Sequence, residues 1–338
     1  MTEKMKTAVV ILNWNGKKFL EQFLAGVVKH SEGDADVIVA DNGSTDDSIA
    51  WLQSNFPEVR IIKIAENKGF TGGYNEALKQ IDAEYFVLLN SDIEVTEGWI
   101  KPVVALMDSD LYVAACQPKI LSFAERRKFE YAGAAGGYID WLGYPFCRGR
   151  IFEEIEEDQG QYDDSREVFW ATGACMFVRA KTFHELGGFD ENFFAHMEEI
   201  DLCWRMKNAG HKVFYCGGSK IYHVGGGTLH KSNPHKTFLN FRNNLLLLIN
   251  NLPTEKLLPI LLLRFFLDGT AAIRFSLKGN FPDAFAVFRA WMEVMLNFFR
   301  KWKKKNAHYA QVSGIYQNSI VVEYYLRGKK KFPELDMD

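Results

Sequence analysis

Residues 85–94 read YFVLLNSDIE, and this stretch is the best single guide to the fold. Its first five residues are large and apolar without interruption, which is typical of a strand buried on both faces of a parallel sheet. The run ends abruptly at Asn90, Ser91 and Asp92, and Glu94 follows after one isoleucine. Because asparagine, serine and aspartate are also ordinary turn residues, the cluster alone fits a turn as well as a polar site.

The same pattern recurs along the first 120 residues. Apolar runs of strand length occur at residues 7–12, 36–40, 59–64 and 112–116, and helical patterns lie between the runs at 17–30, 46–55, 72–80 and 97–108. Strands that alternate with helices predict an α/β fold with a doubly wound, mostly parallel sheet. Ligands bind such sheets beyond the carboxyl ends of the strands. Polar clusters follow three of the predicted strands, at residues 13–16, 41–47 and 90–94, and predict a ligand site at that edge.

The rest of the chain divides into two parts. Residues 122–168 predict a loop and hairpin insertion, and they are followed by a predicted strand at 174–179, a helix at about 198–208 and strands near 212–216 and 220–224. From Thr237 the chain changes to apolar helices with many phenylalanines and clustered basic residues. We therefore expect one domain over residues 1–236, with halves at 1–120 and 121–236, and a helical region over 237–338.

Composition narrows the class of protein. Hydrophobic residues make up 47% and charged residues 25% of the 338 residues, so the chain can bury a globular core. A net charge of −3 argues against a general nucleic-acid binder. Five cysteines without a C-x-x-C pair argue against a zinc knuckle or a disulfide framework. The apolar run that begins at Ala8 is too short for a signal peptide, so we expect the protein in the cytoplasm.

A dinucleotide-binding domain is the first alternative for such a sheet. Asp41 follows the second strand and could hold a ribose hydroxyl. That class of domain needs G-x-G-x-x-G after the first strand, where the backbone approaches a pyrophosphate. Here the loop reads NWNGKK (13–18), with a single glycine. The sequence therefore argues against dinucleotide binding.

A series of motifs carries a clear family resemblance. In order, the chain contains VVILNWNG, VIVADNGSTDDS, ENKGFTGGYNEAL, LLNSDIE, ATGACMFVR, GGFDENFF and EEIDLCWRMKNAGHKV, followed by HVGGG. From about residue 7 to residue 250 the chain resembles glycosyltransferase family 2, particularly the bacterial branch with rhamnosyltransferases of cell-surface polysaccharide assembly. The resemblance implies the GT-A fold, a UDP- or dTDP-sugar donor, Mg²⁺ or Mn²⁺, and transfer with inversion at the anomeric carbon. It also implies a glycan acceptor, which we expect to be lipid-linked, with the donor in residues 1–120 and the acceptor in 121–236.

The resemblance assigns donor contacts to the first half of the chain. It places Leu12, Trp14 and Asp41 beside the nucleotide, where a carboxylate can accept from a uracil or thymine N–H or from ribose hydroxyls. Trp14 could stack on the base or pack beneath its loop. The stretch ENKGFTGGYN (66–75) would contribute Asn67, Gly72 and Asn75 to donor binding, although it also fits a flexible turn before a helix.

The same resemblance gives the opening cluster a role in metal and diphosphate binding. Asp92 takes the place of the last aspartate in the D-x-D motif of the family, and a carboxylate there can hold a cation against a departing diphosphate. Asn90 takes the first place as an amide, suited to the ribose or to a metal-bound water. His223 matches a histidine that ligates the cation in some relatives, but it also fits a structural role. Glu94 fits either the same site or the solvated surface.

Inverting transfer needs a base for the acceptor hydroxyl. Glu198, Glu199 and Asp201 lie at the start of a predicted helix, where carboxylates are favoured on electrostatic grounds alone. Alignment of EEID (198–201) with the E-D-x-D pattern of the family makes Glu199 the base, with Asp201 as the second candidate. Glu198 would then support the loop.

The helical region suggests contact with a membrane. Its longest uncharged apolar stretch, 257–263, is far below the ~20 residues of a spanning helix. Leucine, phenylalanine and tryptophan alternate with basic residues, and RKWKKK (300–305) and RGKKK (327–331) follow. Such a composition is typical of helices that lie in the interface of a membrane with anionic lipids, and it implies a peripheral location on the inner face of the cell membrane. Two core helices with a solvated basic tail are the alternative.

Two other functions fit parts of the pattern. A nucleotidyltransferase that forms an activated sugar would also combine α/β nucleotide binding with Mg²⁺, but it would release pyrophosphate and would need no base at Glu199. A catalytically silent glycan-binding module would keep the fold without the chemistry. Intact Asp41, Asp92 and Glu199 argue against the second of these.

Overall fold

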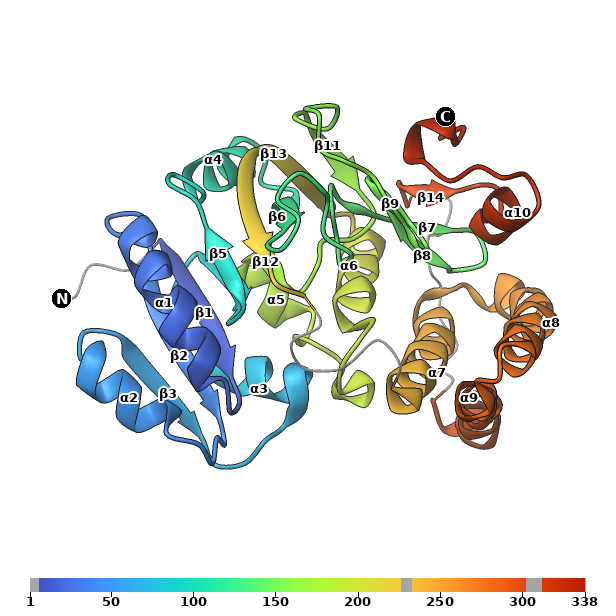
Figure 1. Cartoon of the computed structure of the whole chain (residues 1–338), viewed down its shortest axis with the longest axis horizontal. Helices are drawn as coiled ribbons and strands as arrows, with labels where there is room; N and C mark the ends of the chain where they lie inside the picture. Colours follow the sequence, from blue (N-terminus) through green and yellow to red (C-terminus); the bar gives the residue numbers. More distant parts are fainter. Residues whose placement is uncertain (1–5, 226–232, 302–311, 338) are drawn as a thin grey trace.

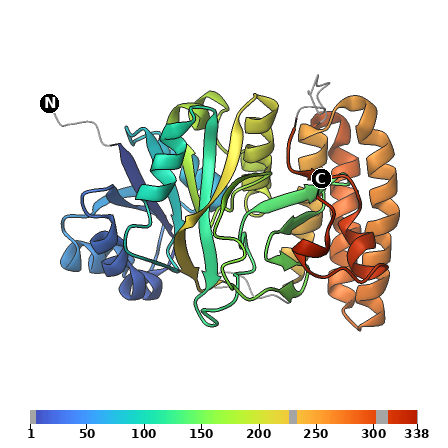
Figure 2. The same ribbon diagram turned by 90° about the horizontal axis from the view of Figure 1, so that it is seen from above.

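The computed structural model describes residues 6–225, 233–301 and 312–337. A large sheet flanked by helices occupies one end of the molecule, and three long helices occupy the other (Figures 1 and 2). A small second sheet is formed by residues 137–155, which interrupt the large sheet in sequence, together with residues 315–316 near the end of the chain.

The first half of the chain forms the parallel part of the large sheet, in the order β4-β1-β2-β3. The strands are β1 (Thr7–Asn13), β2 (Asp36–Asn42), β3 (Arg60–Ile64) and β4 (Tyr85–Asn90). Their side chains alternate between two cores: Ala8 and Val10 pack with α3, whereas Val9 and Ile11 pack with α1 and α2. The helices are α1 (Lys17–Ser31), α2 (Ser48–Asn55) and α3 (Gly69–Leu78). Because both faces are covered, the central strands β1 and β4 are apolar up to their polar ends, whereas the edge strand β3 carries the exposed Arg60 and Lys63.

The second half of the large sheet is mixed rather than parallel. Strand β12 (Cys175–Arg179) lies antiparallel between β4 and β6 (Val113–Ser122), so the 112–116 run does not extend the parallel sheet directly as expected. A strand that is buried on both faces has the same apolar pattern in either direction. The sequence of β12 therefore does not indicate that it runs antiparallel to its neighbours. Strand β13 (Lys212–His223) is one irregular strand where two were expected, and it pairs with β6, β11 (Ser165–Val168) and β5 (Ile93–Val95).

The remaining short elements surround this sheet. Helix α4 (Lys101–Ser109) joins the core beneath α1, and α5 (Ala180–Glu185), a short 3-10 helix (Glu191–Phe193) and α6 (Glu198–Asn208) follow β12. The predicted insertion forms the second sheet from β7 (Gly137–Asp140), β8 (Pro145–Cys147), β9 (Arg150–Ile151) and β10 (Glu154–Ile155). Near the end of the chain, β14 (Ile315–Tyr316) completes that sheet, and α10 (Ile320–Tyr325) and a 3-10 helix (Phe332–Glu334) follow.

Three helices form the C-terminal layer: α7 (Pro234–Asn251), α8 (Thr254–Leu277) and α9 (Phe281–Lys301). Helix α7 packs on α6, and its residues 245–249 belong to the same apolar core as the large sheet. The expected division at 236/237 therefore falls inside a helix that is part of the main core. Among the described helices, none combines the length and apolar character required to cross a membrane.

Candidate active site

The polar clusters that follow the strands lie together at one edge of the sheet. Asn13 at the end of β1 pairs with Asp41 of β2, and Leu12 pairs with Asn90 of β4. The amino end of the antiparallel strand β12 reaches the same edge, where the Asn90 N–H donates to the Ala174 carbonyl at 2.9 Å. The site therefore combines the carboxyl ends of three strands with the start of a fourth.

Asp41 is held by neighbours from two strands. Its Oδ1 accepts from Asn13 Nδ2 at 3.1 Å, and its Oδ2 accepts from the backbone N–H of Ser44 at 3.2 Å. Trp14, in the loop after β1, is 49% exposed and does not pack beneath that loop. Leu12 is part-buried and packs closely against Gly73 of α3. A Cβ atom added to Gly73 would lie only 2.9 Å from Leu12 Cδ1. A carboxylate and an aromatic face thus lie at the edge where the resemblance places the nucleotide.

Residues 66–75 lead into α3 and form its first turns. The side chains of Asn67 and Asn75 form hydrogen bonds with other parts of the protein. Asn67 Oδ1 accepts from Asn42 Nδ2 at 3.0 Å and from the N–H of Gly69 at 2.9 Å, while Gly72 is buried within the helix. Asn75 donates to the Phe189 carbonyl and accepts from the Phe189 N–H, both at 2.9 Å. The structure therefore gives the Asn75 amide a supporting role, because both of its ends hold the segment that leads to α6.

Asp92 and His223 form a buried pair. Pairing of β5 with the end of β13 places Ile93 opposite His223 and sets Asp92 Oδ1 3.2 Å from His223 Nε2. The other ring nitrogen, Nδ1, lies 3.4 Å from Glu130 Oε2. Burial opposes a charge on the imidazole, but the hydrogen bonds with Asp92 and Glu130 outweigh it and raise the pKa of His223 to about 10. Burial likewise opposes ionisation of Glu130, and its contact with His223 leaves the pKa of that carboxyl lowered.

The pair fits a divalent cation. Two ligand atoms at about 2.1–2.3 Å from one ion, in neighbouring positions, lie about 3 Å apart, close to the observed 3.2 Å. A metal-bound histidine commonly directs its second nitrogen to a carboxylate, as His223 does toward Glu130. No group of three or more histidine, cysteine, aspartate or glutamate side chains in the described ranges is arranged to hold an ion.

Sequence reasoning did not single out Glu130. No motif surrounds it, and its partner His223 is on a distant strand. Only the pairing of β6 with β13, together with the bridge between Leu121 and Phe129, reveals the contact. Glu94, which was a candidate for the same site, instead forms a two-pronged ion pair with Arg126, with both distances 2.8 Å. Glu94 therefore belongs to the surface.

Glu198 and Glu199 begin α6 in a different environment. Burial raises the pKa of both carboxyl groups, to about 7 for Glu199, and repulsion from Glu199 adds to the rise at Glu198. The Oε2 atom of each has no hydrogen-bond partner among the described residues. A Cβ on Gly173 would lie 3.8 Å from Glu199 Cβ, and Gly173 precedes Ala174 at the sheet edge. Glu199 thus combines an unpaired oxygen and a pKa near neutrality with a position beside the donor edge.

Asp201 does not share this environment. It is fully buried, its Oδ2 accepts from Arg205 Nε at 2.7 Å, and its Oδ1 accepts from Asn251 Nδ2 at 2.7 Å. With both oxygens engaged inside the protein, Asp201 ties α6 to α7. The structure therefore corrects the prediction of Asp201 as the second candidate for the base.

Helix α7 holds the segment that carries the two glutamates. Phe194, His196 and Met197 have left-handed backbones, with φ of 62°, 70° and 72°. Asn243 Nδ2 donates to the carbonyls of Phe193, Ala195 and His196, at 2.9, 2.8 and 2.7 Å. Non-glycine residues adopt this conformation only where their surroundings impose it. Sequence reasoning missed this contact, although buried polar residues in the apolar run FRNNLLLLINN (241–251) were a signal for it.

Comparisons with known proteins identify the family. A family model described as "Glycosyl transferase family 2" matches residues 8–187. The N-acetylglucosaminyl-diphospho-decaprenol L-rhamnosyltransferase of Mycobacterium tuberculosis is 26% identical over 243 residues, which cover 64% of this chain and 75% of the relative. A low-salt glycan biosynthesis hexosyltransferase of Haloferax volcanii is 22% identical over 247 residues, which cover 71% of this chain and 74% of that protein.

Solved structures share the fold at low identity. GalNAc-T7 with UDP, GalNAc and Mn²⁺ has a TM-score of 0.56 and 15% identity, with 73% of this chain and 48% of that chain covered. S. aureus TarS 1–349 in complex with UDP-GlcNAc also has a TM-score of 0.56, with 16% identity and coverage of 85% and 79%. These likenesses establish the GT-A fold. The chain belongs to glycosyl transferase family 2 and is similar to a rhamnosyltransferase of that kind.

Proposed function

We propose that the protein transfers a sugar, with inversion, from a UDP- or dTDP-sugar to a hydroxyl of a lipid-linked glycan, with Mn²⁺ or Mg²⁺ as cofactor. The observation that carries the proposal is the presence, around one sheet edge, of the Asp92–His223 pair and the unpaired carboxyl of Glu199. Several relatives support it. The mycobacterial relative is named for a decaprenol-linked substrate, and solved neighbours were crystallised with UDP, UDP-GlcNAc or Mn²⁺.

In this proposal the donor lies along the ends of β1, β2 and β4. Asp41 accepts from the base or the ribose, and Trp14 offers its exposed face to the base. Asp92 and His223 would hold the cation, with the imidazole releasing its proton on binding. The cation would supply positive charge to the departing diphosphate. An imidazole ligand suits Mn²⁺ better than Mg²⁺, so we expect Mn²⁺ to support the higher activity.

The transfer itself is a single displacement. The acceptor oxygen attacks the anomeric carbon on the face opposite the diphosphate, and a new C–O bond forms. The bond between that carbon and the diphosphate oxygen breaks, and its electron pair leaves with the nucleoside diphosphate. The hydroxyl proton passes to the carboxylate of Glu199, whose pKa of about 7 suits proton uptake at neutral pH. Attack from the opposite face inverts the configuration.

Product analysis distinguishes this reaction from nucleotidyl transfer. Purified protein should be incubated with Mn²⁺, a panel that includes UDP-GlcNAc and dTDP-rhamnose, and a polyprenyl-diphosphate-linked sugar as acceptor. Release of nucleoside diphosphate together with a lengthened acceptor is expected, and NMR of the product should show an inverted anomeric centre. Release of pyrophosphate would indicate the nucleotidyltransferase alternative. Retention of configuration would overturn the role of Glu199.

A further inference from the structure

Helix α8 has its polarity reversed. Its Arg264 and Asp268 side chains are each only 1% exposed, whereas Leu262 is 60% and Phe266 is 63% exposed. A surface helix of a soluble domain normally buries its apolar residues and exposes its charged ones. The outward face of α8 is therefore built for a partner less polar than water.

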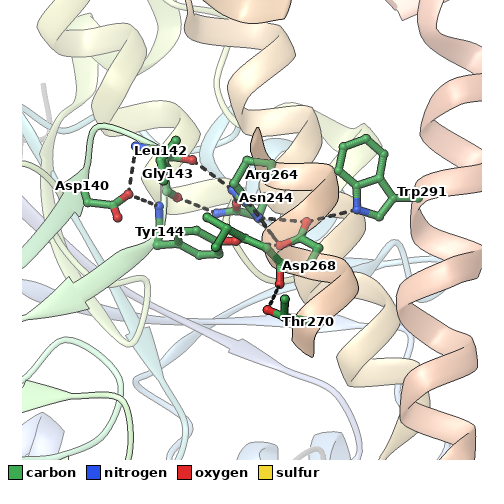
Figure 3. A network of polar contacts seen from close by, with 10 residues as sticks. Asp140, Leu142, Gly143, Tyr144, Asn244, Arg264, Asp268, Thr270 and Trp291 are labelled. Carbon is green, nitrogen blue, oxygen red and sulfur yellow. Dashed lines mark hydrogen bonds and ion pairs between the residues drawn. The ribbon is translucent and has the colours of Figure 1, made fainter. Parts of the chain in front are cut away.

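Buried polar contacts fix the rotation of α8 (Figure 3). Arg264 pairs with Asp268 at 3.3 Å and donates to the Leu142 carbonyl at 3.0 Å. Asp268 also accepts from the Tyr144 hydroxyl at 2.8 Å and from Trp291 Nε1 at 3.0 Å. If α8 were rotated so that its apolar face became buried, Arg264 and Asp268 would lose these partners. Loss of a partner is costly for a buried charge. The apolar face is therefore a fixed feature of the folded protein.

Helix α9 continues the same kind of surface. It packs along α8, and Phe265 and Trp291 make an edge-on ring contact with centroids 5.4 Å apart. The exposed large apolar residues of the two helices are Leu258, Leu262, Leu263, Phe265, Phe266, Ile273, Leu277, Phe281, Phe285, Phe288, Met292, Met295 and Leu296. We call this set the α8–α9 face. Exposed apolar patches of this kind mark sites of interaction with proteins or membranes.

The charged residues around the α8–α9 face indicate which of these two kinds of partner fits better. After Glu255 at the start of α8, the exposed charged residues of the described side chains on these helices are Lys256, Arg274, Lys278 and Arg289, all basic. The acidic residues are engaged elsewhere: Asp283 accepts from the Thr237 hydroxyl, and Glu293 pairs with Arg242 at 3.4 Å. The sequence then continues with Lys303, Lys304 and Lys305, which lie outside the described residues.

We propose that the α8–α9 face lies in the interface of a bilayer that contains anionic lipids. Apolar side chains would enter the acyl boundary while basic ones meet the headgroups. A symmetric dimer through the same face would bring identical basic residues toward one another, so a second copy fits less well. The inference rests on the proposed function for its purpose: α7 contacts both α9 and the segment before Glu198, so docking would bring a lipid-linked acceptor toward the site.

Vesicle flotation of the full chain tests the proposal. Wild-type protein should float with vesicles of 70% phosphatidylcholine and 30% phosphatidylglycerol in 50 mM salt, and binding should weaken but persist in 1 M salt, where the Debye length falls to about 3 Å. The triple variant Leu262→Gln, Phe266→Gln, Phe288→Gln should bind at least about tenfold more weakly at both salt concentrations. Lys278→Gln with Arg289→Gln should weaken binding only in low salt. Leu111→Gln, which alters an exposed apolar residue on the catalytic half, is the matched control and should bind like wild type.

Light scattering and activity on a water-soluble acceptor complete the test. The triple variant should remain monodisperse, with the same mass and the same turnover on the soluble acceptor as wild type. A wild-type protein that ignores anionic vesicles, or a dimer that the triple variant abolishes, would overturn the membrane assignment and indicate a second copy instead. Vesicle binding without any sugar transfer would leave the surface assignment intact and contradict the proposed function alone.

Discussion

Two groups of buried carboxylates lie near the same sheet edge, and their surroundings are opposite. Asp92 and Glu130 flank His223, so each negative charge has a cationic imidazole within 3.4 Å. Glu198 and Glu199 have each other as neighbours, and burial raises the pKa of both. Each carboxylate of the first group has a partner in His223, whereas burial of the second group favours a bound proton.

This contrast assigns two different kinds of chemistry to one edge. Acid and base roles in an active site are commonly separated by environments that drive pKa values apart. Two carboxylates around an imidazole suit a cation, once the imidazole has released its proton. A carboxyl with an unpaired Oε2 and a pKa near neutrality suits a proton in transit. The difference therefore predicts that variants in the two groups fail in different ways.

The largest effect is expected for Glu199→Gln. Removal of the base should lower kcat for sugar transfer by ~100-fold to 10,000-fold, the usual contribution of a positioned base. The affinity for UDP with Mn²⁺ should stay within about twofold of wild type, because Glu199 is not in the Asp92 group. Steady-state kinetics and calorimetry measure the two quantities. Asp201→Asn is the comparison: if it caused the larger loss of kcat in a folded protein, the assignment of the base would be wrong.

A smaller effect is expected for Glu130→Gln. Glu130 does not reach the cation in this account but orients His223, and loss of such a partner typically weakens metal affinity by about 10-fold to 100-fold. Electron paramagnetic resonance of Mn²⁺ measures binding without any substrate. Glu94→Gln removes a carboxylate from the same stretch of surface and should leave the Mn²⁺ affinity unchanged. Equal losses in both variants would mean that general negative charge, and not the contact with His223, matters.

The pH dependence should follow the Glu199 carboxyl. Since burial raises its pKa to about 7, the base is protonated below that pH, and kcat/KM should fall about tenfold per pH unit on the acid side. The groups that face it include Glu198, whose pKa is raised well above its usual value by burial and by repulsion from Glu199. A profile of kcat/KM against pH from 5 to 9 tests this. A flat profile between pH 5 and 7 would contradict the role of Glu199.

The smallest effect is on stability. In the unfolded chain Glu199 titrates near 4.5, and in the folded protein near 7. Its contribution to folding is therefore complete below pH 4.5 and is lost as the pH rises through 7. Glu199→Gln, which stays neutral, should raise the melting temperature at pH 8 but not at pH 4.5. Asp201→Asn should lower it at both, because it removes an accepting oxygen from Arg205 or Asn251. A destabilised Glu199→Gln at pH 8 would mean that the carboxylate is paired.

Much of the fold and of the candidate site could be predicted from the sequence, because the deciding signals for these parts are local. The apolar run before Asn90 indicated a doubly buried strand, and the polar ends of three parallel strands had to meet at one edge. The direction of β12 could not be predicted, because a buried strand has the same pattern either way. Glu199 and Asp201 have similar surroundings in sequence. The contacts of Asp201 with Arg205 and with Asn251, the second 50 residues away, separate their roles.

The contacts that sequence reasoning missed are also long-range. Glu130 lies far from His223 in the sequence, and Asn243 is 50 residues from Phe193. Glu130 lies in no recognised motif, so the sequence alone does not relate it to His223. The reversed polarity of α8 is a further case: composition predicted membrane contact, but only the buried Arg264–Asp268 pair shows which face points outward.

Binding of UDP with Mn²⁺ to two variants tests the central contrast most directly. Calorimetry on Asp92→Asn and Glu199→Gln, each with UDP and with dTDP in the presence of Mn²⁺, should be paired with a melting curve to confirm folding. The account predicts that Asp92→Asn loses at least about tenfold in nucleotide affinity, and that this loss disappears when Mn²⁺ is chelated. It predicts that Glu199→Gln binds as wild type does while transfer is lost. Wild-type affinity in Asp92→Asn, or equal losses of affinity in both variants, would contradict the division of the edge into a cation group and a proton group.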